Sequence, residues 1–227
     1  CKVAAIGPAT ADALRERGIE PDFIPARYVK RAAAYVGNQL KICTVVGFPN
    51  GYSTPEVKVF ETEDAIRGGA DEIDMVADLG LVKSGDWEGV LEEIKAVKAS
   101  CKGRILKVIV EACQLTQEEK VAACRVVSMS GADFIKTSTG KEYPGASLEA
   151  AYVMCQCIKE YYDKTGRMVG FKPAGGVRSA KDAASYYTIV KEVLGEKWLT
   201  NEYFRIGASG LANNLLTEIW GTETKYF

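Results

Sequence analysis

Four ionisable residues stand inside stretches of this chain that otherwise read as buried strands. Asp74 lies in EIDMV, Lys107 in LKVIVE and Lys136 in FIKTST, and Lys172 ends the run VGFK. An isolated buried lysine costs several kcal/mol, so groups of this kind are paired, shifted in pKa or functional. A salt-bridge network around Asp74 would explain any one of them, but we do not expect it to explain all four together.

Two lysines close to each other point to a definite chemistry. A neighbouring cation and desolvation both lower the pKa of a lysine toward neutrality. A neutral amine can attack a carbonyl and form an iminium, which then serves as an electron sink. Asp74, or a water that it holds, could move protons during carbinolamine formation and abstraction at the adjacent carbon. This is the chemistry of a Schiff-base aldolase, which requires no metal and no cofactor.

The composition removes several other kinds of catalysis. The chain has no histidine, so Ser-His-Asp and Cys-His mechanisms are excluded and acid–base work must come from Lys, Asp, Glu or Tyr. Its 7 cysteines contain no CxxC pair, so neither a disulfide framework nor a Cys/His zinc site is expected. We expect mostly buried thiols in a cytoplasmic protein.

The pattern along the chain predicts eight strands that alternate with eight helices. Connections are short, and no linker-like stretch divides the 227 residues, so we expect one domain. The predicted strands are Lys2–Ile6, Asp22–Pro25, Lys41–Val46, Glu72–Val76, Arg104–Val110, Phe134–Thr137, Met168–Lys172 and Tyr203–Ile206. The predicted helices are Ala9–Arg17, Ala26–Val36, Thr54–Arg67, Trp87–Ser100, Thr116–Met129, Ser147–Asp163, Ser179–Leu194 and Ser209–Trp220.

This alternation fits two α/β architectures, a closed (β/α)8 TIM barrel and a doubly wound open sheet. An open nucleotide-binding sheet would place a GxGxxG loop after an early strand. Here the glycine-rich loops follow late strands, at Gly175-Gly176 and Gly207. Because barrels usually bind phosphate after their last strands, we predict the barrel, with Lys136 and Lys172 at its carboxyl-terminal mouth.

The charge balance excludes some partners. A net charge of −1 with both signs interspersed offers no basic field for nucleic acid or an acidic membrane surface. Neither a signal peptide nor an apolar run of spanning length is visible. Neither nucleic acid nor a membrane is therefore an expected partner.

Several long motifs resemble one known family. GFPNG, GADEIDMV, LKVIVEA, GADFIKTSTGK, GFKPAGGVRSAKDA and FRIGASG are similar to deoxyribose-phosphate aldolase, a class I aldolase with a barrel fold, over about residues 28–227. The resemblance implies that Lys136 is the Schiff-base lysine, Lys172 the neighbour that tunes it and Asp74 the proton-relay acid. It also implies that Lys107 lines the sugar pocket. The residues implied to hold the phosphate are Thr139, Gly140, Lys141, Gly175, Gly176, Val177, Arg178, Gly207, Ala208 and Ser209.

The start of the chain departs from that family. Its usual first strand of Asp-x-Thr-Leu type and second strand ending in Cys-x-x-Pro type are missing, and Asp22 stands about where the cysteine would be. Residues 2–25 instead resemble a βαβ piece of uroporphyrinogen-III synthase. We therefore expect an engineered or recombined chimera in which residues 1–27 form a foreign unit that completes the barrel and impairs turnover. Natural divergence of this segment stays open as the alternative.

The resemblance implies a small phosphosugar or aldehyde as the partner, and reversible cleavage of 2-deoxyribose 5-phosphate to acetaldehyde and glyceraldehyde 3-phosphate as the reaction. Three alternatives stay open: a folded barrel scaffold without significant turnover, another class I Schiff-base enzyme acting on a different phosphosugar, and a uroporphyrinogen synthase. The last is the least favoured, because one βαβ unit cannot build a two-domain cleft. A homodimer also stays open as the assembly.

Overall fold

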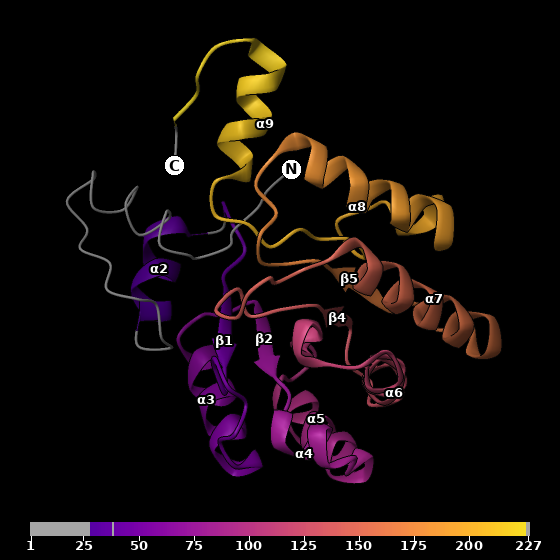
Figure 1. The fold of residues 1–227 in the computed structure, drawn as a ribbon. Helices are drawn as coiled ribbons and strands as arrows, with labels where there is room; N and C mark the ends of the chain where they lie inside the picture. The colour runs from indigo at the N-terminus through magenta and orange to yellow at the C-terminus, as the bar shows by residue number, and fades with distance from the viewer. Residues whose placement is uncertain (1–27, 38, 226–227) are drawn as a thin grey trace.

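The computed structural model describes residues 28–37 and 39–225, and its centre is a five-stranded parallel sheet. The strands are β1 (Cys43–Val46), β2 (Glu72–Val76), β3 (Ile105–Ile109), β4 (Phe134–Lys136) and β5 (Gly170–Lys172), paired in that order. Parallel neighbours need a crossover between them, and helices fill that role. Figure 1 shows these helices fanned around the outside of the strands.

The helices match most of the predicted positions. They are α2 (Val29–Val36), α3 (Pro55–Arg67), α4 (Leu79–Ser84), α5 (Trp87–Ser100), α6 (Gln117–Met129), α7 (Leu148–Thr165), α8 (Ala180–Val193) and α9 (Leu211–Trp220), with 3-10 turns η2 (Ala112–Gln114) and η3 (Glu196–Trp198). The short α4 was not predicted. Asp78 caps its start by accepting from the amides of Gly80 and Leu81, and Gly85 ends it with a φ of 76°.

The predicted strand Tyr203–Ile206 does not form a continuous ladder. It touches β5 through one isolated parallel bridge, Phe171 to Phe204, and a second bridge, Ala174 to Gly207, follows just beyond both segments. Its backbone still follows that edge, because the Phe171 amide donates to the Tyr203 carbonyl at 2.8 Å and the Arg205 amide donates to the Phe171 carbonyl at 3.2 Å. The predicted elements Lys2–Ile6, Ala9–Arg17 and Asp22–Pro25 lie outside the described residues.

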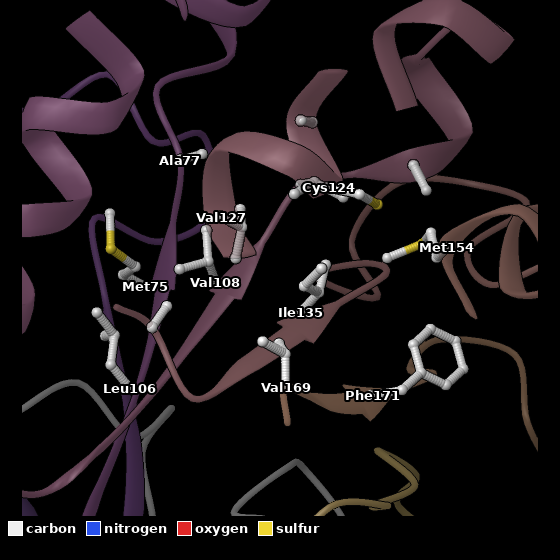
Figure 2. Packing of buried hydrophobic residues seen from close by; sticks show 14 of the residues in the cluster. Met75, Ala77, Leu106, Val108, Cys124, Val127, Ile135, Met154, Val169 and Phe171 are labelled. Carbon is white, nitrogen blue, oxygen red and sulfur yellow. The ribbon is translucent and has the colours of Figure 1, made fainter. Parts of the chain in front are cut away.

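Side chains alternate between two faces of the sheet, as the strand period requires. One set is apolar and packs against the helices: Met75, Leu106, Val108, Ile135 and Phe171 join Cys124, Val127 and Met154 in a single buried cluster (Figure 2). The other set includes Asp74, Lys107, Lys136 and Lys172 and lies on the opposite face. The strands therefore carry an apolar outer layer and a polar interior.

A GAD triplet precedes both β2 and β4 and fixes how each strand aligns with its predecessor. Asp71 donates its amide to the Ile42 carbonyl at 2.8 Å, while its carboxylate accepts the Ile42 amide at 2.8 Å. Asp133 makes the same reciprocal pair with Leu106, at 2.9 and 2.7 Å. These paired bonds set the start of the ladder, so they also set which interior side chains lie opposite one another.

Candidate active site

Asp74 lies at the centre of the polar interior and binds three lysines. Its Oδ1 accepts from Lys107 Nζ at 2.8 Å. Its Oδ2 accepts from Lys136 Nζ at 2.8 Å and from Lys172 Nζ at 2.7 Å. The ladder explains the meeting, because Asp74 pairs with Lys107 across β2 and β3 and Lys136 pairs with Lys172 across β4 and β5. The amine nitrogens of Lys136 and Lys172 share one oxygen, so they lie no farther apart than the sum of those two bonds.

The buried charges shift the pKa values of both Asp74 and Lys136. Burial alone would raise the pKa of Asp74, but the charges of Lys107, Lys136 and Lys172 outweigh burial and hold that pKa well below its usual value. Burial lowers the pKa of Lys136; the carboxylate of Asp74 opposes that change and the charge of Lys172 adds to it. The site therefore pairs a firmly ionised carboxylate with a lysine that gives up its proton more readily than usual.

Lys107 has the opposite character. Burial would lower its pKa, but the negative charges around it, with Asp74 first among them, raise the pKa instead. Its Nζ also lies 2.7 Å from Glu72 Oε2, and Arg205 approaches the other oxygen of Glu72 at 3.1 Å. Lys107 is thus held as a cation by two carboxylates, which leaves Lys136 as the better candidate for a neutral amine.

Three of these interior residues were not predicted as site members. Cys43 Sγ lies 3.2 Å from Asp74 Oδ1 and 3.3 Å from Lys107 Nζ. Burial raises the pKa of the Cys43 thiol, and the Asp74 charge raises it further, so it remains protonated. Glu72 and Arg205 stand at the start of β2 and after the β5 edge. Polar residues are common at strand boundaries, so the sequence did not mark Glu72 and Arg205 as site residues. Their place in the site is clear only from the strand register.

The glycine loops predicted to hold a phosphate meet at the carboxyl-terminal ends of β4 and β5. Gly140 and Gly175 have φ values of 79° and 82°, a region that favours glycine. A Cβ on Gly175 would stand 3.2 Å from the Cα of Gly140, so the two loops are in close backbone contact. Ala146 also donates its amide to the Gly175 carbonyl at 3.1 Å.

Several amides around these loops remain available for an anion. Within the described part of the chain, no protein acceptor is recorded for the amides of Gly140, Gly176, Val177, Ala208 and Ser209. Gly207 lies beside Lys172 in space, since a Cβ on Gly207 would be 3.4 Å from Lys172 Cε. Backbone amides that converge at loops and helix starts are well suited to bind phosphate.

Three of the predicted phosphate residues already donate their backbone amides within the protein. The Arg178 amide donates to Asp182 Oδ2 at 3.2 Å, and the same carboxylate closes the capping box with Ser179 at the start of α8. Thr139 donates both its amide and its hydroxyl to the buried carboxylate of Glu111. The exposed Lys141 uses its amide to donate to Thr139 Oγ1 at 3.1 Å. These backbone amides are therefore not available to an anion.

Among residues 28–37 and 39–225 no helix combines the length and apolar character needed to cross a bilayer. The same residues contain no cluster of three or more Cys, Asp or Glu side chains placed to hold a metal ion.

The parallel strands, their outer helices and the charged interior are those of an α/β enzyme, and the structural neighbours show the predicted barrel fold class. A model of the DeoC/LacD family aldolases matches residues 19–195. A deoxyribose-phosphate aldolase of Streptococcus pyogenes serotype M4 is 55% identical over 172 residues, which are 76% of this chain and 74% of the relative. One from Streptococcus agalactiae serotype Ia is 54% identical over the same share of each chain.

Solved structures agree with that assignment. The structure of QR15, an aldolase, is 30% identical with a TM-score of 0.74, covering 93% of this chain and 88% of that one. The tetrameric deoxyribose phosphate aldolase from Aeropyrum pernix, at 24% identity, has the same fold with a TM-score of 0.72, covering 93% of this chain and 81% of its own. The chain belongs to the DeoC/LacD family of aldolases, which confirms the predicted family resemblance.

The family match also bears on the segment predicted to be foreign. The match begins at residue 19, so it includes residues 19–25 of the stretch that resembled uroporphyrinogen-III synthase. Residues 2–18 lie outside both that match and the described structure.

Proposed function

We propose that the chain catalyses the reversible aldol cleavage of 2-deoxy-D-ribose 5-phosphate to acetaldehyde and glyceraldehyde 3-phosphate, through a Schiff base on Lys136. The observation that carries this proposal is the sharing of Asp74 Oδ2 by Lys136 and Lys172. The 55% identity to a deoxyribose-phosphate aldolase supports the choice of substrate.

Lys136 is the better nucleophile of the barrel lysines. Its pKa is lowered by burial and by the Lys172 charge, so a larger fraction of its amine is neutral than in an ordinary lysine. Lys107 is fixed as a cation between Glu72 and Asp74. After burial, the charge of Lys172 further lowers the pKa of Lys136.

The proposed steps balance without a metal or an external reductant. The neutral Nζ of Lys136 adds to the C1 carbonyl of the open-chain sugar, and loss of water gives an iminium. Removal of the C3 hydroxyl proton breaks the C2–C3 bond. C3 becomes the aldehyde of glyceraldehyde 3-phosphate, and the electron pair of the broken bond forms the C1–C2 double bond of an enamine. A proton added at C2 and a water added at C1 then release acetaldehyde and restore the amine.

Asp74 acts in this scheme as a carboxylate. The charges of the three lysines that surround it hold its pKa well below the usual value, so it is ionised in the resting site. It therefore orients the lysines and accepts hydrogen bonds from them. The acid–base steps then pass through a water that Asp74 holds, or through Asp74 itself only after Lys136 has left it to join the substrate.

The substrate phosphate is proposed to lie over the loops that follow β4 and β5 and the segment at Gly207. The free amides of Gly176, Val177, Ala208 and Ser209 would bind it, with Lys141 and Arg178 adding charge. Titration of inorganic phosphate against the thermal unfolding midpoint tests this site. An absence of stabilisation at millimolar phosphate would argue against it.

Borohydride trapping with acetaldehyde tests the Schiff base directly. We expect the wild-type chain to gain the mass of one ethyl group, and peptide mapping to place it on Lys136. Lys136→Met should abolish the adduct, whereas Lys95→Met, which removes an exposed lysine on α5, should leave it intact. An adduct that persists in Lys136→Met, or that maps to another lysine, would contradict the assignment.

The departure of the N-terminal sequence leads to a second expectation. We propose that residues 1–227 form one barrel domain and that a foreign segment within residues 2–25 lowers turnover, because two strand ends of the pocket then lack the family's usual hydroxyl, acid and thiol. A displacement of about 1 Å can cost about a hundredfold in rate. We therefore expect borohydride to trap the iminium readily while the cleavage rate is far below that of a family member with the usual N-terminus. A coupled cleavage assay of both proteins measures the difference in rate. Equal cleavage rates would show that this segment does not matter, and trapping without any cleavage would favour the scaffold alternative.

A further inference from the structure

Glu111 stands two residues after Ile109, the last residue of β3, in an unusual backbone conformation. The residue is only 1% exposed to solvent. Its backbone has φ 48° and ψ 58°, which lies in the left-handed region. A residue with a Cβ pays roughly 1–2 kcal/mol to stay there. Such a conformation persists only where surrounding contacts hold it, so the contacts of Glu111 indicate what it is for.

The Glu111 carboxylate holds a single residue of the next loop, Thr139. Its Oε2 accepts the Thr139 amide at 3.2 Å and also accepts the Thr139 hydroxyl. The Thr139 Oγ1 in turn accepts the Lys141 amide at 3.1 Å. Thr139 therefore has neither its amide nor its hydroxyl proton left for a ligand, although it was predicted to contact the phosphate.

The backbone on both sides of this contact is joined as well. The Val110 amide donates to the Lys136 carbonyl at 3.1 Å, and the Ala112 amide donates to the Thr137 carbonyl at 2.8 Å. The segment around Glu111 thus supports the chain from Lys136 onward. One residue after Thr139, the backbone of Gly140 lies against that of Gly175.

We propose that Glu111 is a positioning residue, which fixes Thr139 so that the amide of Gly140 and the side chain of Lys141 face the phosphate of the substrate beside the Gly175 loop. Thr139 then acts as the link between the buried carboxylate and the anion loop and does not itself bind the phosphate. This inference rests on the proposed function, because it assigns a device to the phosphate end of that site.

The test compares two substrates that differ only in the phosphate. For each variant, kcat/KM is measured with 2-deoxyribose 5-phosphate and with 2-deoxyribose, and the ratio of the two is the readout. Glu111→Gln and Thr139→Val should each lower that ratio about tenfold or more, the loss that one hydrogen bond to a charged group commonly produces. Thr139→Ser, which keeps the hydroxyl, should restore the ratio. Glu118→Gln, an exposed glutamate on α6, serves as the matched control and should leave it unchanged.

If Glu111 had only a general structural role, its replacement would lower kcat/KM equally for both substrates and leave the ratio constant. That result would overturn the proposal. So would an unchanged ratio in Thr139→Val, which also covers the case in which Glu111→Gln does not fold. If the wild-type chain cleaves neither substrate, the proposed function fails separately. Titration of inorganic phosphate against wild type and Thr139→Val then decides: weaker phosphate binding by the variant supports the positioning role, and equal binding overturns it.

Discussion

Replacing Lys172 by methionine should raise the pKa of Lys136 and slow its attack on aldehydes. Both amines bind Asp74 Oδ2, at 2.7 and 2.8 Å, so their charges are separated by at most about 5.5 Å, the sum of these two distances. At an effective dielectric constant of about 20, two like charges at that separation repel by about 3 kcal/mol. Methionine fills nearly the same volume without the charge, so this repulsion is lost while the packing is kept.

A second effect acts in the same direction. Once Lys172 no longer donates to Asp74 Oδ2, that oxygen accepts from Lys136 alone, and the carboxylate favours the ammonium form more strongly. We therefore expect the adduct with acetaldehyde to form about ten- to a hundredfold more slowly at neutral pH, since each 1.4 kcal/mol is about tenfold in the neutral fraction. At strongly alkaline pH, where Lys136 is neutral in both proteins, the difference should shrink.

The assay is borohydride trapping under single-turnover conditions from mildly acidic to alkaline pH. The profile of Lys172→Met should move to higher pH, whereas Lys172→Arg, which keeps a cation beside Asp74, should stay close to wild type. A profile that does not move, or that moves to lower pH, would refute the tuning role. Equal behaviour of the methionine and arginine variants would show that the shape of Lys172 matters and its charge does not.

Two further predictions concern stability. The folded-state pKa of Asp74 is depressed by its lysines, so this carboxylate contributes stability above its unfolded pKa of about 3.9 that is lost as the pH falls from there toward the folded value; the unfolding free energy of Asp74→Asn, measured by urea titration, should depend less on pH in that window. Lys58 is fully buried, 2.5 Å from Glu93 between α3 and α5, so Lys58→Met should cost about 3–5 kcal/mol by stranding the carboxylate. Lys95→Met, which removes a pair on the surface of α5, should cost at most about 0.5 kcal/mol in the same denaturation experiment.

The strands were accessible from the sequence because each carries a short apolar run between helical patterns. All five strands of the described sheet fall inside predicted segments. The short α4 was overlooked, although Asp78 and Gly85 are the cap residues expected of a helix. The segment Tyr203–Ile206 has the composition of a strand, but composition does not say whether both its edges are paired, and its bonds to β5 are isolated bridges.

The charged centre was accessible for a different reason. Lysine is rare inside a buried strand, so the sequence alone marks Lys107, Lys136 and Lys172 as candidate site residues. Glu111 gave no such signal, because an acid just after a strand is common and its importance lies in a contact with Thr139, 28 residues later in the chain. Cys43 reads as an apolar residue of β1, and only the coordinates place its thiol against Asp74. Contacts across strands depend on register, which the sequence pattern alone does not specify.

Two aspartates in the sequence nevertheless help to set the strand register. Asp71 and Asp133 each close a reciprocal pair of hydrogen bonds with the residue at the foot of the preceding strand, Ile42 and Leu106. A slip of one residue would turn the interior side chains of that strand toward the helices. Asp74 stands three residues after Asp71, and Lys136 stands three residues after Asp133, so each GAD triplet carries its catalytic candidate to the same face of the sheet. In the ladder Asp74 is level with Phe134, two residues before Lys136, and the long lysine side chain covers that difference. The two aspartates therefore fix the register in which the carboxylate and the amine meet.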